Sequence, residues 1–322
     1  MQQRTLAGTQ LSIGRVVFGA MTFGSQVDLA EATRMVDVCR EAGVTMFDTA
    51  NSYNDGESER MLGRIVAPVR DEVLLATKVG NRTGPDPDDA GLSRAAIGKA
   101  IDSSLRRLST DHVDLYYLHL PDRDTPVEES LEALHDLVQA GKVRYGATSN
   151  HAAWQMAQMH CLAAHHGWDA LPVSQPLYNL LARRLEDEYA AFSQRFRISN
   201  IVYNPLAGGL LSGKHAAGRA PEAGSRFTLD HYRRRYWNDA QFTAVEALRA
   251  IAAAAGLSLI ELAFRWLLSR PLVDAVLVGA SSCDQLVVDL AACATTTLDQ
   301  AVADRCDEVW ATLRGAAPAY NR

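Results

Sequence analysis

The stretch Phe47-Asp48-Thr49-Ala50-Asn51-Ser52-Tyr53 gives the first indication of the fold. A short apolar run, residues 44–47, leads into it and stops at the carboxylate of Asp48. The residues that follow are rich in Asn, Ser, Asp and Gly, which is typical of a loop, and this loop contains Tyr53. A charged side chain where a buried strand opens to solvent is better placed for chemistry than for packing.

Two further apolar runs end in the same way. Residues 73–77 lead to Lys78, and residues 113–118 lead to His119. Each side chain alone has a simple structural explanation, such as an ion pair or a hydrogen-bonded histidine. Charged or titratable side chains directly after three successive apolar runs are less expected by chance. We therefore predict that the fold brings four side chains together: Asp48, Tyr53, Lys78 and His119.

Short apolar runs alternate with helical patterns along the whole chain. The runs are not polar on one side, which is typical of strands covered on both faces, and strand–helix alternation favours a parallel sheet. The eight expected strands are residues 15–18, 44–47, 73–77, 113–118, 143–147, 172–175, 198–203 and 275–278. The expected helices are residues 28–41, 57–66, 93–108, 127–140, 151–166, 185–195, 241–255, 258–269, 284–292 and 299–314. Residues 213–240 read as irregular, and residues 4–6 and 11–13 as a small hairpin.

Two architectures fit this alternation. A doubly wound sheet would normally carry a GxGxxG motif after its first strand, but Gly19-Ala20-Met21-Thr22-Phe23-Gly24 does not match that pattern. Eight strand–helix units favour a closed barrel, and polar residues at the carboxyl ends of the strands fit its catalytic face. We predict one domain over residues 1–322, an α/β (β/α)8 TIM barrel with an N-terminal β-hairpin and extra C-terminal helices.

Composition excludes several classes of protein. The 32 Lys and Arg and 38 Asp and Glu residues give a net charge of −6, which argues against nucleic acid as a partner. The five cysteines are scattered without a CxxC motif, as expected for buried thiols in a reducing cytoplasm. We expect no signal peptide and no membrane span, because the N-terminus lacks an apolar core and no uncharged apolar run reaches about 18 residues.

The four side chains suit proton transfer to a carbonyl oxygen. Tyrosine is a weak acid with a free pKa of about 10, and we expect the cation of Lys78 to lower the pKa of Tyr53. Asp48 would hold Lys78 in place, and His119 would hydrogen-bond the carbonyl oxygen. This is the chemistry of carbonyl reduction, and the hydride would come from a nicotinamide cofactor.

The sequence resembles the aldo-keto reductase superfamily over essentially its whole length. The resemblance is carried by Phe47-Asp48-Thr49-Ala50 with Tyr53, Thr77-Lys78, Asp114-Leu115-Tyr116-Tyr117-Leu118-His119, Gly146-Ala147-Thr148-Ser149-Asn150 and Gln175-Pro176-Leu177-Tyr178-Asn179. It implies that Asp48, Tyr53, Lys78 and His119 form the catalytic tetrad, with Tyr53 as general acid. It also implies that NADPH binds extended across the barrel without a Rossmann domain.

The chain is most similar to the aflatoxin-aldehyde and succinic-semialdehyde reductase branch, on Gly19-Ala20-Met21, the run from Tyr203 to Lys214, and Arg235-Tyr236-Trp237. The resemblance implies that Ser149, Asn150 and Gln175 hold the carboxamide and that Tyr203 stacks on the nicotinamide. The full set of implied cofactor residues is Gly19, Met21, Asp48, Ser149, Asn150, Gln175, Tyr203, Asn204, Pro205, Leu206, Gly208, Gly209, Leu210, Ser212, Lys214, Arg226, Gly279, Ser281, Ser282, Gln285 and Asp289.

Three departures from the family pattern stand out. Asp289 replaces the usual asparagine near the adenine, and its charge would disfavour a nearby 2′-phosphate. The run 281–285 contains no Lys or Arg, so a preference for NADPH rests on Lys214, Arg226 and two serines, with NADH as the alternative. Asn321 replaces an aromatic residue before the terminal arginine.

The resemblance also suggests a substrate. Arg235 and Arg322 match positions that bind a substrate carboxylate in this branch, and a guanidinium can bind a carboxylate through two hydrogen bonds. Small aldehydes, including acidic semialdehydes, are therefore expected substrates. The implied substrate-binding residues are Met21, Tyr53, His119, Arg235, Trp237 and Arg322, with Phe23 as a further apolar wall.

Other functions remain open from sequence. A biosynthetic ketoreductase acting on a bulky ketone or a nucleotide-linked keto sugar would use the same tetrad. A low-turnover regulatory subunit could keep the fold and the cofactor. A metal-dependent hydrolase is disfavoured because no His-x-His motif occurs, and we expect no metal. A homo-oligomer is compatible with the sequence, which does not determine the oligomeric state.

Overall fold

Eight parallel strands close into a barrel in which each strand pairs with the next in chain order and β10 returns to pair with β3. The structure is a computed structural model that describes residues 3–222 and 224–317. The predicted (β/α)8 barrel is confirmed, and the doubly wound alternative is excluded because the sheet has no open edge. The strands are β3 (Val16–Gly19), β4 (Met46–Asp48), β5 (Leu74–Val79), β6 (Val113–Leu118), β7 (Val143–Ser149), β8 (Val173–Gln175), β9 (Ser199–Val202) and β10 (Ala275–Val278).

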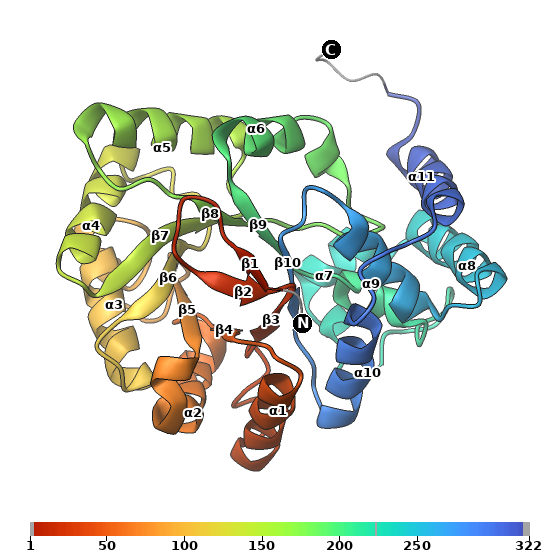
Figure 1. Ribbon diagram of the computed structural model, residues 1–322, viewed down its shortest axis with the longest axis horizontal. Coiled ribbons are helices and arrows are strands. Elements are labelled where there is room, and N and C mark those ends of the chain that lie inside the picture. The colour runs from red at the N-terminus through yellow and green to blue at the C-terminus, as the bar shows by residue number, and fades with distance from the viewer. Residues whose placement is uncertain (1–2, 223, 318–322) are drawn as a thin grey trace.

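Helices surround the barrel, as Figure 1 shows, with α8 and α11 packed against each other outside the ring. The helices are α1 (Leu29–Glu41), α2 (Glu57–Val66), α3 (Arg94–Leu108), α4 (Val127–Gln139), α5 (Ala153–His166), α6 (Tyr189–Phe196), α7 (Asp230–Tyr236), α8 (Asp239–Ala254), α9 (Leu259–Ser269), α10 (Cys283–Cys293) and α11 (Gln300–Arg314). Short 3-10 turns are η1 (Tyr53–Gly56), η2 (Ala67–Glu72), η3 (Pro87–Asp89), η4 (Arg184–Glu186), η5 (Ala207–Ser212) and η6 (Arg226–Thr228).

Helix α1 shows how local sequence sets an element. The Asp28 carboxylate caps its start by accepting a hydrogen bond of 2.9 Å from the backbone N–H of Glu31. The helix buries one apolar face, and Gly43 follows it with φ 80, a conformation that favours glycine. The buried face consists of Ala32, Met35, Val36 and Cys39, as the sequence predicts.

The prediction that residues 213–240 are irregular is wrong in part. This region contains η6 and the seven-residue helix α7. The run of three arginines on α7 resembles a solvated loop in sequence, but Tyr232 and Tyr236, one helical turn apart, are buried against the core. Tertiary packing of the two rings therefore stabilises a helix that is too short to form alone.

Side-chain alternation along the strands separates packing from chemistry. Successive residues of a strand point to opposite faces, so residues i and i+2 share the interior of the barrel. One apolar layer fills the amino-terminal half of that interior: Val17, Met46, Ala76, Leu115, Tyr117, Ala147, Val173, Ile201 and Ala275. Two positions after members of this layer come the polar residues Asp48, Lys78, His119, Ser149, Gln175 and Tyr203. The polar residues therefore gather at the carboxyl ends of the strands.

A hairpin closes the opposite end of the barrel. Strands β1 (Gln3–Thr5) and β2 (Ser12–Gly14) pair antiparallel and lie across the centre of the view in Figure 1. Leu6, Leu11 and Ile13 belong to the same buried cluster as the inner apolar layer. The hairpin thus shields the interior from water on one side, and the barrel opens only at its carboxyl-terminal end.

Within the described part of the chain, no single helix combines the length and apolar composition of a membrane span. Helices α8 and α9 meet both criteria only when taken together, and they are bent by 89° relative to each other. Both bury apolar side chains against the core, which accounts for their composition.

The contact between α2 and α3 gives a prediction on stability. A Cβ atom on Gly63 would lie 2.4 Å from the backbone oxygen of Leu108, so we expect Gly63→Ala to destabilise the fold by about 1–3 kcal/mol through overpacking. The matched control is Gly98→Ala on α3, where a Cβ meets nothing within 4 Å and should stabilise by about 0.5–1 kcal/mol. Urea unfolding of both variants measures the difference, and equal stabilities would contradict this packing.

Candidate active site

The side chain of Lys78 is fully buried inside the barrel and is held by two partners. Its ammonium forms an ion pair with Asp48 Oδ1 and donates a hydrogen bond of 2.7 Å to the carbonyl oxygen of Thr49. Gln175 donates from Nε2 to the other oxygen of Asp48 at 2.9 Å. A buried charge is stable only when it is paired and hydrogen-bonded, so these contacts define one geometry for the pair.

The ionisation of this pair follows from burial and proximity. Burial lowers the pKa of Lys78, but Asp48 first and Tyr53 second, through charge and hydrogen bonding, together outweigh burial, so the net pKa is raised and the ammonium stays charged. Burial raises the pKa of Asp48, while Lys78 and then Gln175 act against that rise. The result is a fixed positive charge beneath the mouth of the barrel.

Tyr53 begins the 3-10 turn η1, and its ring covers the lysine. The Nζ atom of Lys78 lies 5.1 Å from the centroid of the Tyr53 ring, and the ring meets that of His119 edge-on at 5.9 Å between centroids. Burial raises the pKa of Tyr53, and the Lys78 charge opposes this without reversing it. The expected effect of Lys78 is present, but the expectation of a lowered pKa is wrong in its net direction because desolvation of the phenolate is the larger cause.

His119 is held by its backbone and by one ring nitrogen. The backbone N–H of His119 donates to the carbonyl of Val79 at 2.8 Å, and the backbone carbonyl of His119 accepts a hydrogen bond of 2.8 Å from the side-chain amide of Asn150. The Nδ1 atom of His119 lies 2.9 Å from Nδ2 of Asn81. Burial and then the charge of Lys78 lower the pKa of His119 to about 3, so the imidazole is neutral near pH 7.

A cleft of about 890 Å³ extends from these side chains to α10. Among the predicted residues that line it are Gly19, Met21, Asp48, Tyr53, His119, Ser149, Asn150, Gln175, Tyr203, Asn204, Pro205, Leu206, Gly208, Gly209, Lys214, Arg226, Arg235, Gly279, Ser281, Gln285 and Asp289. Lys78 lies beneath the floor of the cleft, where it contacts Asp48. The structure therefore brings together three of the four predicted catalytic residues on the surface of one cleft, with the fourth directly below.

The lining of the cleft offers polar and cationic groups of the kinds that a nicotinamide dinucleotide requires. At one end, the amide and hydroxyl groups of Ser149, Asn150 and Gln175 can pair with a carboxamide. Gly19 and Gly279, at the ends of the paired strands β3 and β10, also line the cleft, and a Cβ on Gly279 would lie 3.3 Å from the carbonyl oxygen of Gly19. The other end holds cationic side chains for phosphate, Lys214 and Arg226, and an unpaired buried oxygen on Asp289.

Besides Lys78, four predicted site residues among the described residues lie outside this lining: Leu210, Ser212, Ser282 and Trp237. Trp237 packs against Phe227, with ring centroids 4.7 Å apart, and supports the fold of the loop. The Ser282 hydroxyl caps α10, and Leu210 is fully buried in the core. Phe23, the further apolar wall, is also fully buried. Arg322 lies outside the described residues, as does Asn321.

Several residues of the cleft were not anticipated from sequence. Asn81 contacts His119, and His231 and Tyr232 line the side near Arg235. The Gln26 side chain donates to the carbonyl of Gly224 at 2.6 Å and so joins two loops at the rim. Of these residues, only Asn81 could have been predicted from sequence, because it is a polar residue that follows the strand carrying Lys78, at the same end of the barrel.

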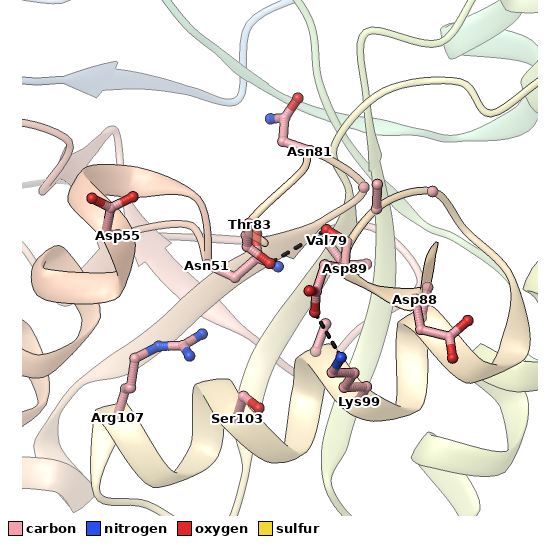
Figure 2. A pocket seen from close by; sticks show the side chains of 15 residues that line it. Asn51, Asp55, Val79, Asn81, Thr83, Asp88, Asp89, Lys99, Ser103 and Arg107 are labelled. Carbon is pink, nitrogen blue, oxygen red and sulfur yellow. Dashed lines mark hydrogen bonds and ion pairs between the residues drawn. The ribbon is translucent and has the colours of Figure 1, made fainter. Parts of the chain in front are cut away.

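A second cavity of about 210 Å³ lies beside the cleft, behind the loop that carries Tyr53. Figure 2 shows Asn51, Asn81 and Arg107 around it, and an ion pair of 2.8 Å between Lys99 and Asp89. Asn81 lines both cavities and thus forms part of the wall between them. Among the described residues, no cluster of three His, Cys, Asp or Glu side chains could hold a metal ion.

Comparisons with known proteins agree with this geometry. A model of the aldo/keto reductase family matches residues 15–311. The chain is 36% identical over 300 residues to a probable voltage-gated potassium channel subunit beta of Oryza sativa subsp. japonica, covering 91% of each protein. It is 34% identical over 338 residues to aldo-keto reductase family 7 member A3 of Homo sapiens, covering 97% of this chain and 99% of that protein. It is also 34% identical over 336 residues to aflatoxin B1 aldehyde reductase member 4 of Homo sapiens, covering 97% and 98%.

Asp289 is the most unusual side chain of the cleft. It is 1% exposed, and its Oδ1 atom has no hydrogen-bond partner within the described chain. Burial raises the pKa of Asp289 from its usual 3.8 to about 7. Between these pH values the folded chain keeps a proton that the unfolded chain releases, so folding stability falls as the pH rises through this window.

We therefore expect Asp289→Asn to become increasingly more stable than the parent protein as the pH rises from about 4 to about 7, and this advantage to level off above that pH, because the amide never ionises. The difference in unfolding free energy should grow by at most about 1.4 kcal/mol per pH unit. Thermal unfolding at several pH values measures it. Asp284→Asn is the matched control, since Asp284 is exposed on the same helix and should show no such growth. A pH-independent difference for Asp289→Asn would contradict a buried, protonated carboxyl.

Proposed function

The chain belongs to the aldo/keto reductase family, and from that premise we propose that it reduces aldehydes or ketones to alcohols with NADPH, with Tyr53 as the general acid. As a member of this family it is an oxidoreductase that uses a nicotinamide cofactor and acts on carbonyl groups. The observation that carries the finer proposal is the meeting of Tyr53, His119 and the buried Lys78–Asp48 pair at one end of the cleft.

Each side chain has a definite role in this proposal. The Tyr53 phenol is protonated at neutral pH, since the ordinary pKa of tyrosine is about 10 and burial raises it further, and so it has a proton to donate to the carbonyl oxygen. The Lys78 ammonium lies against the Tyr53 ring, where it stabilises the phenolate left behind, and Asp48 keeps the ammonium charged. His119, neutral at this pH, hydrogen-bonds the same oxygen and orients it. The bound cofactor would supply the hydride.

NADPH is favoured over NADH by the cations near the far end of the cleft. Arg226 and Lys214 line it there, together with Ser281. Arg226 is oriented by a hydrogen bond of 3.2 Å from its Nη1 to the hydroxyl of Tyr232. The sequence suggests that a charged Asp289 would repel a 2′-phosphate. Because burial raises the pKa of Asp289 to about 7, the carboxyl carries this negative charge only above that pH.

Arg235 supports the proposal that the substrate can carry a carboxylate. It lines the cleft beside Tyr203. Burial raises the pKa of Tyr203, and the charge and hydrogen bond of Arg235 oppose this rise. Its charge also contributes, after burial, to lowering the pKa of the neighbouring His231. The guanidinium therefore lies beside Tyr203 in the lining of the cleft, where it would meet the carboxylate of a substrate bound at Tyr53.

One relative favours a second candidate function. The similarity to a probable channel subunit beta fits a protein that binds a cofactor and regulates a partner with little turnover. The complete set of acid, cation, carboxylate and histidine argues for turnover instead. The assay below separates the two, since a regulatory subunit would bind NADPH and reduce carbonyls only slowly. Bulky ketones belong in the same substrate panel, because the ketoreductase alternative uses the same four residues.

We expect Tyr53→Phe to lower kcat/KM for aldehydes by at least about 100-fold, since a positioned general acid typically contributes that much. The affinity for NADPH should change little, because the phenol acts on the substrate. Absorbance of the reduced cofactor follows turnover with NADPH and with NADH, and cofactor fluorescence follows binding. Tyr145→Phe is the control, since its hydroxyl only accepts a hydrogen bond of 3.0 Å from Gln10 at the hairpin. Undiminished turnover in Tyr53→Phe would refute the mechanism.

We expect Arg235→Ala to raise KM for succinic semialdehyde by about tenfold, the cost of losing one hydrogen bond to a charged group, and to leave KM for butanal almost unchanged. Arg234→Ala is the matched control, because that arginine is exposed and does not line the cleft. Steady-state kinetics on both aldehydes give the comparison. If Arg235→Ala affected the two aldehydes equally, the carboxylate hypothesis would fail.

A further inference from the structure

The contact between Asn81 and His119 links two residues from adjacent strands. The Nδ2 atom of Asn81 lies 2.9 Å from Nδ1 of the histidine. Strand β5, which carries Lys78, ends at Val79, and Gly80 then turns the chain with φ 132, a backbone conformation that residues other than glycine rarely adopt. This turn brings Asn81 back beside the histidine that follows β6.

Two properties of His119 make this contact consequential. Burial and the nearby Lys78 charge keep the ring neutral, so it holds a single proton, on either Nδ1 or Nε2. The groups around the ring come from three directions: Lys78 on β5, Tyr53 after β4, and the neutral amide of Asn150 after β7, which donates to the backbone carbonyl of His119. Asn81 is the side chain that contacts a ring nitrogen.

An amide NH₂ group can only donate, and therefore Nδ1 accepts and the proton lies on Nε2. This tautomer presents an N–H to the cleft and can donate to a carbonyl oxygen. The other tautomer would present a lone pair, which repels the negative charge that develops on that oxygen during reduction. The hydrogen bond at one nitrogen thus decides what the other nitrogen can do.

We propose that Asn81 is a positioning residue that holds His119 in the Nε2–H tautomer, so that the histidine donates a hydrogen bond to the substrate carbonyl. The inference rests on the proposed function, in which His119 contacts the carbonyl oxygen. Asn81 is not one of the four predicted catalytic residues, so the proposal adds a further residue to the site. Asn81 lines both the cleft and the second cavity, which Figure 2 shows.

The first test is nuclear magnetic resonance of the full-length protein labelled with ¹⁵N at histidine, without substrate. Two-bond correlations distinguish a protonated from an unprotonated ring nitrogen, and the His119 signals are assigned with His119→Gln. We expect Nε2 protonated and Nδ1 unprotonated in the parent protein between pH 5 and 8. A proton on Nδ1 would overturn the proposal, whatever the protein's activity.

The second test changes the partner of Nδ1. In Asn81→Asp the carboxylate accepts from Nδ1, so the proton should move there or the ring should become an imidazolium. In Asn81→Leu, which has similar size and no polar group, the preference for one tautomer should be lost. We expect kcat/KM for an aldehyde to fall about 100-fold in Asn81→Asp, the typical cost of losing one donor to a developing oxyanion. The dissociation constant of NADPH should stay within a factor of about two, since Asn81 acts on the histidine.

The control variant is Thr83→Val, which lines the second cavity and bonds to Asp89, away from His119. It should leave both the spectrum and kcat/KM unchanged. Circular dichroism checks the folding of each variant, and Asn81→Leu serves as the test if Asn81→Asp does not fold. An unchanged tautomer and unchanged kcat/KM in Asn81→Leu would overturn the proposal.

The tests separate this inference from the proposed function. If the parent protein reduces no carbonyl compound while its spectrum shows the Nε2–H form that Asn81→Leu abolishes, the proposed function fails and Asn81 still sets the tautomer. If the protein reduces aldehydes with the proton on Nδ1, the proposed function stands and the role of Asn81 is refuted.

Discussion

The ion pair between Lys78 and Asp48 is the constraint on which the rest of the site depends. A fully buried ammonium costs several kcal/mol of desolvation unless partners surround it. Here Asp48, the Thr49 carbonyl and, through Asp48, Gln175 provide them. These partners come from β4, the loop after it and β8, so the charge is stable only when the barrel has closed. The loop that carries Tyr53 begins at Thr49, whose carbonyl accepts a hydrogen bond from Lys78, so the network also positions the start of this loop.

The barrel satisfies that constraint because the two ends of its interior differ: one is apolar and closed, and the other is polar and open to the cleft. For six of the eight strands, β4 to β9, an inward residue is apolar and the inward residue two positions later, in the strand or directly after it, is polar. The hairpin with Leu6, Leu11 and Ile13 excludes water from the apolar layer. Water can reach the polar layer only from the cleft, so charges placed there act through a medium of low polarity, where their effect on a reacting oxygen is large.

The positions of the strands, the cap of α1 and the polar strand ends could be predicted from sequence because each depends on residues close together in the chain. Features that depend on distant contacts could not. Helix α7 exists because Tyr232 and Tyr236 pack into the core, and Trp237 faces Phe227 rather than the cleft. The net pKa of Tyr53 depends on how completely the ring is buried, and the contact of Asn81 with His119 depends on the turn at Gly80. Neither the burial nor the orientation of a loop side chain produces a periodic pattern in the sequence, so neither could be predicted from it.

The raised pKa of Tyr53 has a consequence for the direction of the proposed reaction. A general acid works best when it is protonated at the working pH, and the buried phenol meets that condition throughout the neutral range. Oxidation of an alcohol would need the phenolate as a base, which burial disfavours. The charge of Lys78 offsets part of this penalty, because it stabilises negative charge that forms on the phenol oxygen. Burial is the larger of the two effects, so the resting acid keeps its proton, and Lys78 lowers the cost of giving that proton up during reduction.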